Sequence, residues 1–185
     1  MRLGSRTPFH FCGVGVLAVI LAACNAPQDS ALEGGASYRN QDTLIGVTSR
    51  FDEESFSGIW YLRGYLPETE NFDQLAFRIE TAGPQFRIAA NVCDQAGICG
   101  VFAEDLKTRR LGQGRYVIKT LDGVDRRLWV LWIDEGFRTA VIGNPEGTFA
   151  WIIDRSQKGG ADRITAAREI LDFNGYDVSQ LQVKK

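Results

Sequence analysis

Short segments rich in β-branched and aromatic residues, separated by turn residues, run from about residue 58 to residue 155. No helical period interrupts them, so the pattern predicts an all-β domain. The connections contain glycine, proline, asparagine or aspartate, which supply the positive or fixed φ that hairpins need. We expect a simple meander of eight strands, at residues 58–66, 73–82, 85–92, 101–109, 115–121, 127–133, 137–143 and 148–155.

One of these segments is apolar on both faces. Residues 128–133 read Leu-Trp-Val-Leu-Trp-Ile, and a strand of this kind must be covered on both sides. The expected cover is a helix over residues 161–174, which Asn174 and Gly175 close with a left-handed cap. Its apolar positions fall on one stripe: Ile164, Ala167, Ile170 and Leu171.

A short last strand, Leu181 to Val183, is expected to pair with the sheet edge. Eight meandering strands that close on themselves have no free edges and enclose room for about one small ligand. The predicted fold is therefore an eight-stranded antiparallel up-and-down β-barrel with a C-terminal helix packed outside. An open sandwich is the alternative.

The N-terminus has the pattern of an export signal. Arg2 and Arg6 precede an apolar run over residues 11–23, which is about as long as a signal-peptide core and shorter than the ~20 residues that span a membrane. Leu21-Ala22-Ala23-Cys24 resembles the lipobox of bacterial lipoproteins, in which the cysteine becomes lipidated and is the first mature residue. A plain secretory signal followed by a free thiol is the alternative.

The resemblance to a lipobox sets the expected domain boundaries and location. Residues 1–23 are the signal peptide, residues 24–50 a lipidated N-terminus and flexible polar tether, and residues 51–185 the barrel domain. Acyl chains on Cys24 would satisfy the rule that stable anchoring takes more than one chain. Asn25 follows the cysteine, which by analogy favours the outer membrane, facing the periplasm.

Composition excludes several classes of function. Lys+Arg 21 against Asp+Glu 23 leaves no basic surface for nucleic acid. The single histidine, His10, lies in the expected signal peptide, so catalysis or metal binding by imidazole is excluded from the mature protein. No paired carboxylates and no Gly-x-Ser-x-Gly elbow stand out, and we expect no catalytic residues, no metal and no cofactor. The acids of residues 52–54 and the pair Arg109-Arg110 are expected to be solvated surface.

Two cysteines remain after Cys12 and Cys24 are assigned. Cys93 and Cys99 enclose five residues that suit a turn, and an exported pair of this kind is typical of a disulfide. Loop closure would contribute about 2 kcal/mol. A two-thiolate metal site lacks further ligands, and a redox pair is more typically spaced Cys-x-x-Cys.

The residues around the first and last strands resemble the lipocalins. Gly58-Ile59-Trp60, behind a short helical turn at residues 51–56, is similar to the lipocalin Gly-x-Trp signature. Residues 140–143 and 149–155 are similar to the seventh and eighth strands of bacterial outer-membrane lipoprotein lipocalins, including the terminal Arg155. Residues 164–182 resemble the helix and closing strand of that group.

This resemblance implies roles at the closed end of a barrel. Trp60 would plug that end, Arg155 would pack over the indole in a cation–π contact, and Gly58 would leave room for it. Asp134 to Phe137 occupies the loop where the family carries an aspartate and an aromatic. The resemblance is weakest over strands two to four, including the segment from Cys93 to Cys99, where ligand specificity would be set.

Strand parity indicates which side chains line the interior. Counting from Trp60, Leu62 and Gly64 face inward, and on the last strand Phe149, Trp151 and Ile153 do so. We take Leu62, Phe149, Trp151 and Ile153 as ligand-binding candidates, unless the aromatics fill a core without ligand.

Three functions follow from these expectations. The first is a lipid-anchored envelope lipocalin that binds a fatty acid, lysophospholipid or similar molecule for transport, storage or scavenging. The second is a structural or interaction lipoprotein with a filled barrel. The third is a lipocalin-like enzyme that works through carboxylates. The sequence leaves the oligomeric state open.

Overall fold

The described part of the chain forms one compact unit. A computed structural model describes residues 36–67, 72–93, 96–120 and 123–184, all within the unit Leu32–Lys185. Within these ranges no helix has the length and apolar character that crossing a membrane requires. The elements, in chain order, are α1 (Glu53–Phe56), β1 (Gly58–Tyr65), β2 (Gln74–Glu80), β3 (Gly83–Cys93), β4 (Cys99–Leu106), β5 (Thr108–Gly112), β6 (Arg115–Lys119), β7 (Asp125–Ile133), β8 (Thr139–Gly143), β9 (Ala150–Asp154), α2 (Ala161–Phe173) and β10 (Gln182–Val183).

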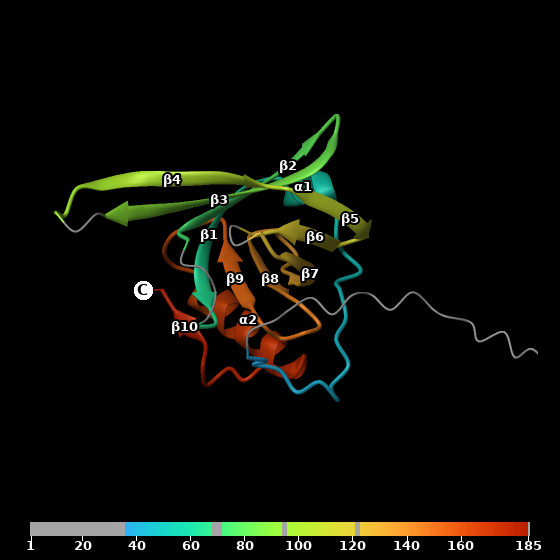
Figure 1. Cartoon of the computed structure of the whole chain (residues 1–185). Helices are drawn as coiled ribbons and strands as arrows, with labels where there is room; N and C mark the ends of the chain where they lie inside the picture. Colours follow the sequence, from blue (N-terminus) through green and yellow to red (C-terminus); the bar gives the residue numbers. More distant parts are fainter. Residues whose placement is uncertain (1–35, 68–71, 94–95, 121–122, 185) are drawn as a thin grey trace, which may run out of the picture. The chain divides into compact units, whose positions relative to one another are not determined.

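The strands form one antiparallel sheet that curves into a barrel (Figure 1). Hydrogen bonds run in the order β4-β3-β2-β1-β9-β8-β7-β6-β5, and β10 pairs with the end of β1 at Gly64 and Tyr65. Only Lys107 separates β4 from β5, so this bent strand closes the ring. The expected meander and the outer helix are confirmed. The short last strand is present, but it pairs with β1, which lies between β2 and β9, and not with an edge strand.

The fourth predicted strand differs from expectation in having two halves with different partners. β4 pairs only with β3, whereas β5 pairs with β6. The β3–β4 hairpin projects from the barrel as a long arm (Figure 1). The alternation of polar and apolar residues could not predict this split, because it does not indicate which neighbouring strand each half pairs with.

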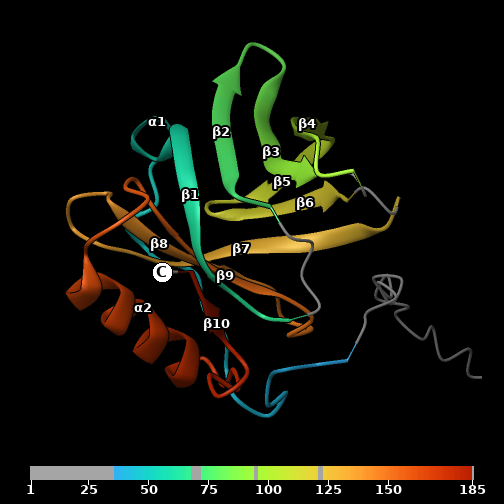
Figure 2. The same ribbon diagram turned by 90° about the vertical axis from the view of Figure 1, so that its left-hand side faces the viewer.

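Two apolar layers hold the unit together. One fills the barrel, and the other lies between the outside of the barrel and α2, with Leu131, Val141, Ile152, Ala167 and Leu171 among its buried members. Figure 2 shows α2 lying along the outside of the barrel and α1 at one end. β7 therefore is covered on both faces, as its sequence requires: Val130 packs inside and Leu131 outside.

Residues 36–50 are not a free tether. Arg39 is buried, and its guanidinium donates to the carbonyls of Asn174, Pro145 and Thr43. Backbone bonds join Tyr38 to Gly147 and Thr48 to Val130. The expected boundary at residue 51 is therefore wrong: this strap (residues 36–50) belongs to the domain. Its polar composition suggested a linker because the contacts that join Arg39 to the barrel domain, those with Asn174 and Pro145, come from residues more than 100 positions away.

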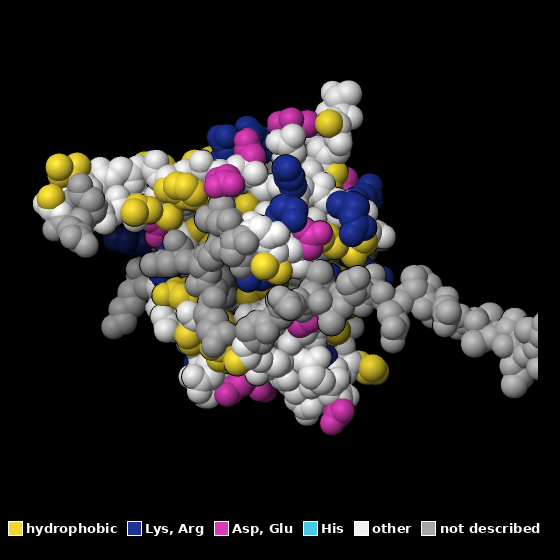
Figure 3. Space-filling view, viewed as in Figure 1, with side chains coloured by type: hydrophobic (Ala, Val, Ile, Leu, Met, Phe, Trp, Pro, Cys, Tyr) yellow, Lys and Arg dark blue, Asp and Glu magenta, His cyan; other side chains and the backbone are white. Residues whose placement is uncertain are grey.

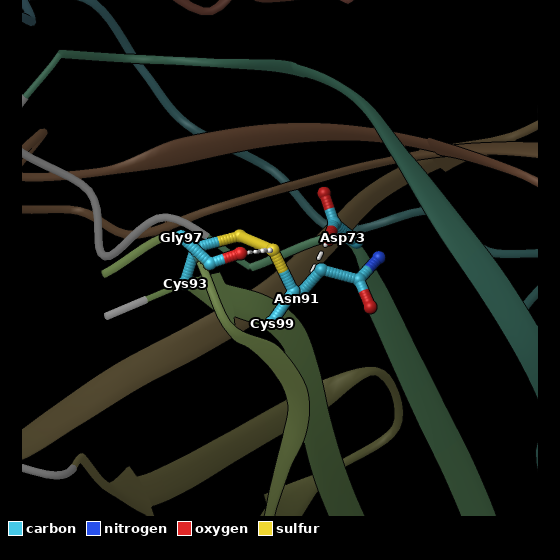
Figure 4. Close-up of a disulfide and its surroundings, with 5 residues drawn as sticks. All are labelled: Asp73, Asn91, Cys93, Gly97 and Cys99. Carbon is cyan, nitrogen blue, oxygen red and sulfur yellow. Dashed lines mark hydrogen bonds between the residues drawn. A yellow bond between two sulfur atoms is a disulfide. The ribbon is translucent and has the colours of Figure 1, made fainter. Parts of the chain in front are cut away.

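The arm ends in the expected disulfide. Cys93 and Cys99 are bonded at the end of the β3–β4 hairpin (Figure 4). At its base the arm is tied to the start of β2, because the Asp73 carboxylate accepts from the backbone N–H of Asn91. Apolar side chains gather along the arm (Figure 3), and the exposed ones are Val92, Ile98, Val101 and Phe102.

Candidate ligand-binding site inside the barrel

Consecutive strands of a meander run in opposite directions, so their connections alternate between two ends of the barrel. The closed end carries α1, the β7–β8 turn (residues 134–138) and Arg155. The opposite end, where β1, β6 and β8 finish and β9 begins, is called the mouth below. The register Tyr65–Trp151 lies toward the mouth and Tyr61–Asp154 toward the closed end.

Aromatic rings fill the closed end. The Trp60 indole is fully buried, and its Nε1 donates to the Phe56 carbonyl at 2.8 Å. The ring centroids of Phe56 and Trp60 lie 4.9 Å apart, and Phe77 packs edge-on against Phe56 at 5.3 Å. Edge-on and tilted rings of this kind pack favourably because ring edges meet ring faces. The barrel is therefore plugged at this end by side chains.

Arg155 covers the plug from outside. Its guanidinium carbon lies 3.7 Å from the Trp60 ring centroid, and its three nitrogens donate to backbone carbonyls, including those of Ser57 and Ile59. Gly58 has φ +113, and a Cβ there would stand 3.0 Å from the Arg155 side chain. The three residues of the family signature thus come together in one contact.

Of the acids at residues 52–54, Asp52 and Glu54 are exposed as expected, but Asp52 and Glu53 also make structural contacts. Asp52 caps the helix, because its carboxylate accepts from the Ser55 N–H at 2.7 Å. The Glu53 carboxylate accepts from the Tyr116 hydroxyl at 2.7 Å and pairs with Arg110 at 3.3 Å. Burial first, and then the bond to Glu53, raises the pKa of Tyr116, so its hydroxyl stays protonated. No local pattern indicates this pairing between residues 63 positions apart.

The β7–β8 turn is organised by Asp134. Its carboxylate accepts from the N–H groups of Arg138 and Thr139, at 2.5 and 2.7 Å. Phe137 takes a positive φ of 52° and packs against the interior layer. An aspartate and an aromatic therefore shape this turn.

The mouth carries a second aromatic group. The Trp151 ring centroid lies 4.8 Å from that of Phe72, which it meets edge-on, and 4.8 Å from that of Phe149. Leu62 and Ile153 are buried in the same interior layer. The four ligand-binding candidates therefore all face the interior. Phe72 was missed, because it is an isolated aromatic in a stretch without strand periodicity.

Gly64 does not face the interior as parity suggested. The pairing of β1 with β9 shifts by one residue between Leu62 and Gly64. A Cβ at Gly64 would contact Ile152, which belongs to the outer layer, while Tyr65 packs against the interior. A bulge reverses the faces of all residues that follow it.

The Trp151 indole N–H has no hydrogen-bond partner, although the side chain is buried. The side chains that contact it are apolar, since its ring meets those of Phe72 and Phe149. Such side chains suit a ligand held by apolar contact rather than by ion pairing.

The described residues hold no group of three or more histidine, cysteine, aspartate or glutamate side chains that could bind a metal ion. Cys24 lies outside the described residues. The buried Asp154 carboxylate accepts from Thr139 and, at 3.0 Å, from Arg163 of α2. It therefore attaches the helix to the barrel.

Comparison with known proteins agrees with this architecture. Residues 106–185 match the family described as Lipocalin-like domain. No curated protein matches the chain.

Three similar solved structures are apocrustacyanins. Lobster apocrustacyanin A1 has a TM-score of 0.53 and 16% identity, over 71% of this chain and 77% of that one. Apocrustacyanin C1 has a TM-score of 0.53 and 13% identity, over 77% and 89%. Apocrustacyanin C2 has the same score and identity, over 82% and 89%. The fold is therefore a lipocalin fold, and proteins of this fold typically bind small hydrophobic molecules.

Proposed function

We propose that this protein is a lipid-anchored lipocalin of the bacterial envelope that binds a hydrophobic or amphipathic small molecule for transport, storage or scavenging. Fatty acids and lysophospholipids are the ligand classes we favour. The observation that carries the proposal is the apolar barrel interior, plugged at one end by Trp60 and lined toward the mouth by Phe149 and Trp151. Burial of apolar ligand surface, at about 25 cal/mol per Å², would provide most of the affinity.

The strap supports anchoring at Cys24. Its first residues bond to the β8–β9 connection at the mouth, through Tyr38 to Gly147 and Arg39 to Pro145. Only twelve positions separate Cys24 from Ala36, where the described chain begins. An acylated Cys24 would therefore leave only this short segment between the outer membrane and the domain.

The first experiment is native mass spectrometry with lipid extraction, on protein purified from its own envelope. We expect a co-purifying lipid and, in the N-terminal peptide, an acylated Cys24. A Cys24→Ser variant controls for the anchor, because it removes the acyl chains and leaves the barrel unchanged. An apo mass, together with no binding of fatty acids or lysophospholipids in titrations, would contradict the carrier function.

A second function is favoured by the arm. Its exposed apolar residues, Val92, Ile98, Val101 and Phe102, suit contact with another molecule. If side chains fill the barrel and no ligand binds there, the protein would act as an interaction lipoprotein, and this exposed surface of the arm would bind its partner. This reading predicts that Phe102→Ser abolishes function without changing stability, and that substitutions of Trp151 act on stability alone.

A further inference from the structure

The two indoles at the ends of the barrel differ in one respect. Trp60 Nε1 donates to a carbonyl of its own chain, whereas Trp151 Nε1 is buried without a partner. The Trp151 side chain is only 5% exposed, so bulk water does not serve it. An unsatisfied buried donor costs about 1–3 kcal/mol, and a ligand that supplied an acceptor would recover that energy.

The charges around Trp151 determine what kind of ligand oxygen its indole N–H can bind. The buried charged side chains of the described chain all bond outside the interior: Arg39 in the strap, Arg63 to Ser156 and Gly159, Asp134 in the β7–β8 turn, and Asp154 to Arg163. A carboxylate placed beside Trp151 would therefore meet no fully buried counter-ion among the described residues, and a buried charge without one costs far more than a buried neutral oxygen.

Among the described residues at the rim of the mouth, Lys184 lies beside this group, and it is already engaged. Lys184 Nζ binds the Asp73 carboxylate at 2.8 Å and the Phe72 carbonyl at 2.9 Å. It also lies 5.9 Å from the Tyr65 ring centroid. The hydrogen bond from Lys184 lowers the pKa of Asp73, so this carboxylate stays ionised at neutral pH beside the Lys184 side chain.

We propose that Trp151 is the polar contact of the ligand site, and that its Nε1 donates a hydrogen bond to an uncharged oxygen of the ligand, the carbonyl of an acyl ester or a ketone. The apolar chain of the ligand then packs against the aromatic group that Trp151 forms with Phe72 and Phe149. This rests on the proposed carrier function and narrows it: an esterified lipid binds better than a free fatty acid of equal chain length.

The test uses three probes with the same alkyl length: methyl palmitate, palmitate and hexadecane, titrated calorimetrically against the purified protein. The variant is Trp151→Phe, which keeps one aromatic ring but removes the donor together with the second ring of the indole, and the hexadecane titration reports the effect of the lost ring contact. The matched control is Trp129→Phe. Trp129 Nε1 is also buried without a partner, but Trp129 packs against the outer layer, beneath Arg115.

We expect wild-type protein to bind methyl palmitate more tightly than palmitate. Trp151→Phe should weaken methyl palmitate binding about 5- to 10-fold, the worth of one hydrogen bond, and leave hexadecane binding unchanged. Trp129→Phe should change neither affinity. Thermal unfolding of each variant, measured in parallel, separates lost binding from lost structure.

The failures of the two proposals are distinguishable. If wild-type protein binds none of the three probes, the carrier function fails, and the role of Trp151 fails with it. If the probes bind but Trp151→Phe weakens the ester no more than hexadecane, only the role of Trp151 is overturned. Tighter binding of palmitate than of its methyl ester would also overturn it, because a cation such as Lys184 would then receive the ligand.

Discussion

The Arg155 guanidinium packs over the Trp60 ring, with its central carbon 3.7 Å from the ring centroid. Its nitrogens donate hydrogen bonds to five backbone carbonyls. These carbonyls belong to residues 55, 56, 57, 59 and 137, so one side chain joins α1, the start of β1 and the β7–β8 turn. The contact fixes the closed end of the barrel.

Replacing Arg155 should therefore destabilise the whole domain. We expect Arg155→Ala to lower the free energy of unfolding by about 2–4 kcal/mol, because it removes charge-assisted hydrogen bonds and exposes Trp60. Arg155→Lys should recover little, since an ammonium lacks the planar fork that reaches several carbonyls. Urea unfolding monitored by tryptophan fluorescence measures both. A Lys variant as stable as wild type would show that charge alone matters.

Asp134 should make stability depend on pH. Burial raises the pKa of this carboxyl, but hydrogen bonds from Thr139 and Arg138 outweigh that effect, so its pKa lies below the ordinary value. A group whose pKa is lowered by folding contributes stability above its unfolded pKa, about 4, and loses it as the pH falls through the folded pKa. Asp134→Asn should therefore cost about 1–2 kcal/mol at pH 7, and the deficit should shrink toward pH 3. Urea unfolding at pH 7, 5 and 3 measures this, and a deficit that is constant with pH would contradict it.

The disulfide should stabilise the arm rather than the barrel. Cys93 and Cys99 join the ends of a hairpin whose outer residues are exposed and belong to neither apolar layer. We expect a Cys93→Ala/Cys99→Ala variant to lose less than about 1 kcal/mol of global stability, although loop closure alone predicts about 2 kcal/mol. Amide exchange in the arm should accelerate at least tenfold. Loss of the full loop-closure energy in urea unfolding would instead show that arm and barrel unfold together.

The strap should detach when Arg39 is removed. Its guanidinium is the buried link to Asn174 and Pro145, so we expect Arg39→Ala to cost about 1–3 kcal/mol and to expose residues 36–50 to proteases. Arg50→Ala is the matched control, because Arg50 makes an exposed ion pair with Glu135 at 3.3 Å, which is worth little. Equal protease resistance of Arg39→Ala and wild type would show that other contacts hold the strap.

Much of the fold could be read from local pattern. Strand periodicity, hairpin residues and the stripe of α2 are properties of neighbouring residues, and the same is true of a disulfide across six positions. The contact between Gly58, Trp60 and Arg155 spans nearly 100 residues, and only the resemblance to lipocalins anticipated it. The inward positions of Phe149, Trp151 and Ile153 followed from parity because β9 has no bulge.

The sequence by itself determined the meander, the helix that covers it and most inward side chains of the first and last strands, because each depends on a short repeat of polar and apolar positions. Only the tertiary structure decided that the fourth strand splits between two partners, that Gly64 turns outward, that Arg39 is buried and that Trp151 lacks a partner. Each of these features depends on contacts between residues that are far apart in the sequence, and a local pattern of polar and apolar positions does not predict such contacts.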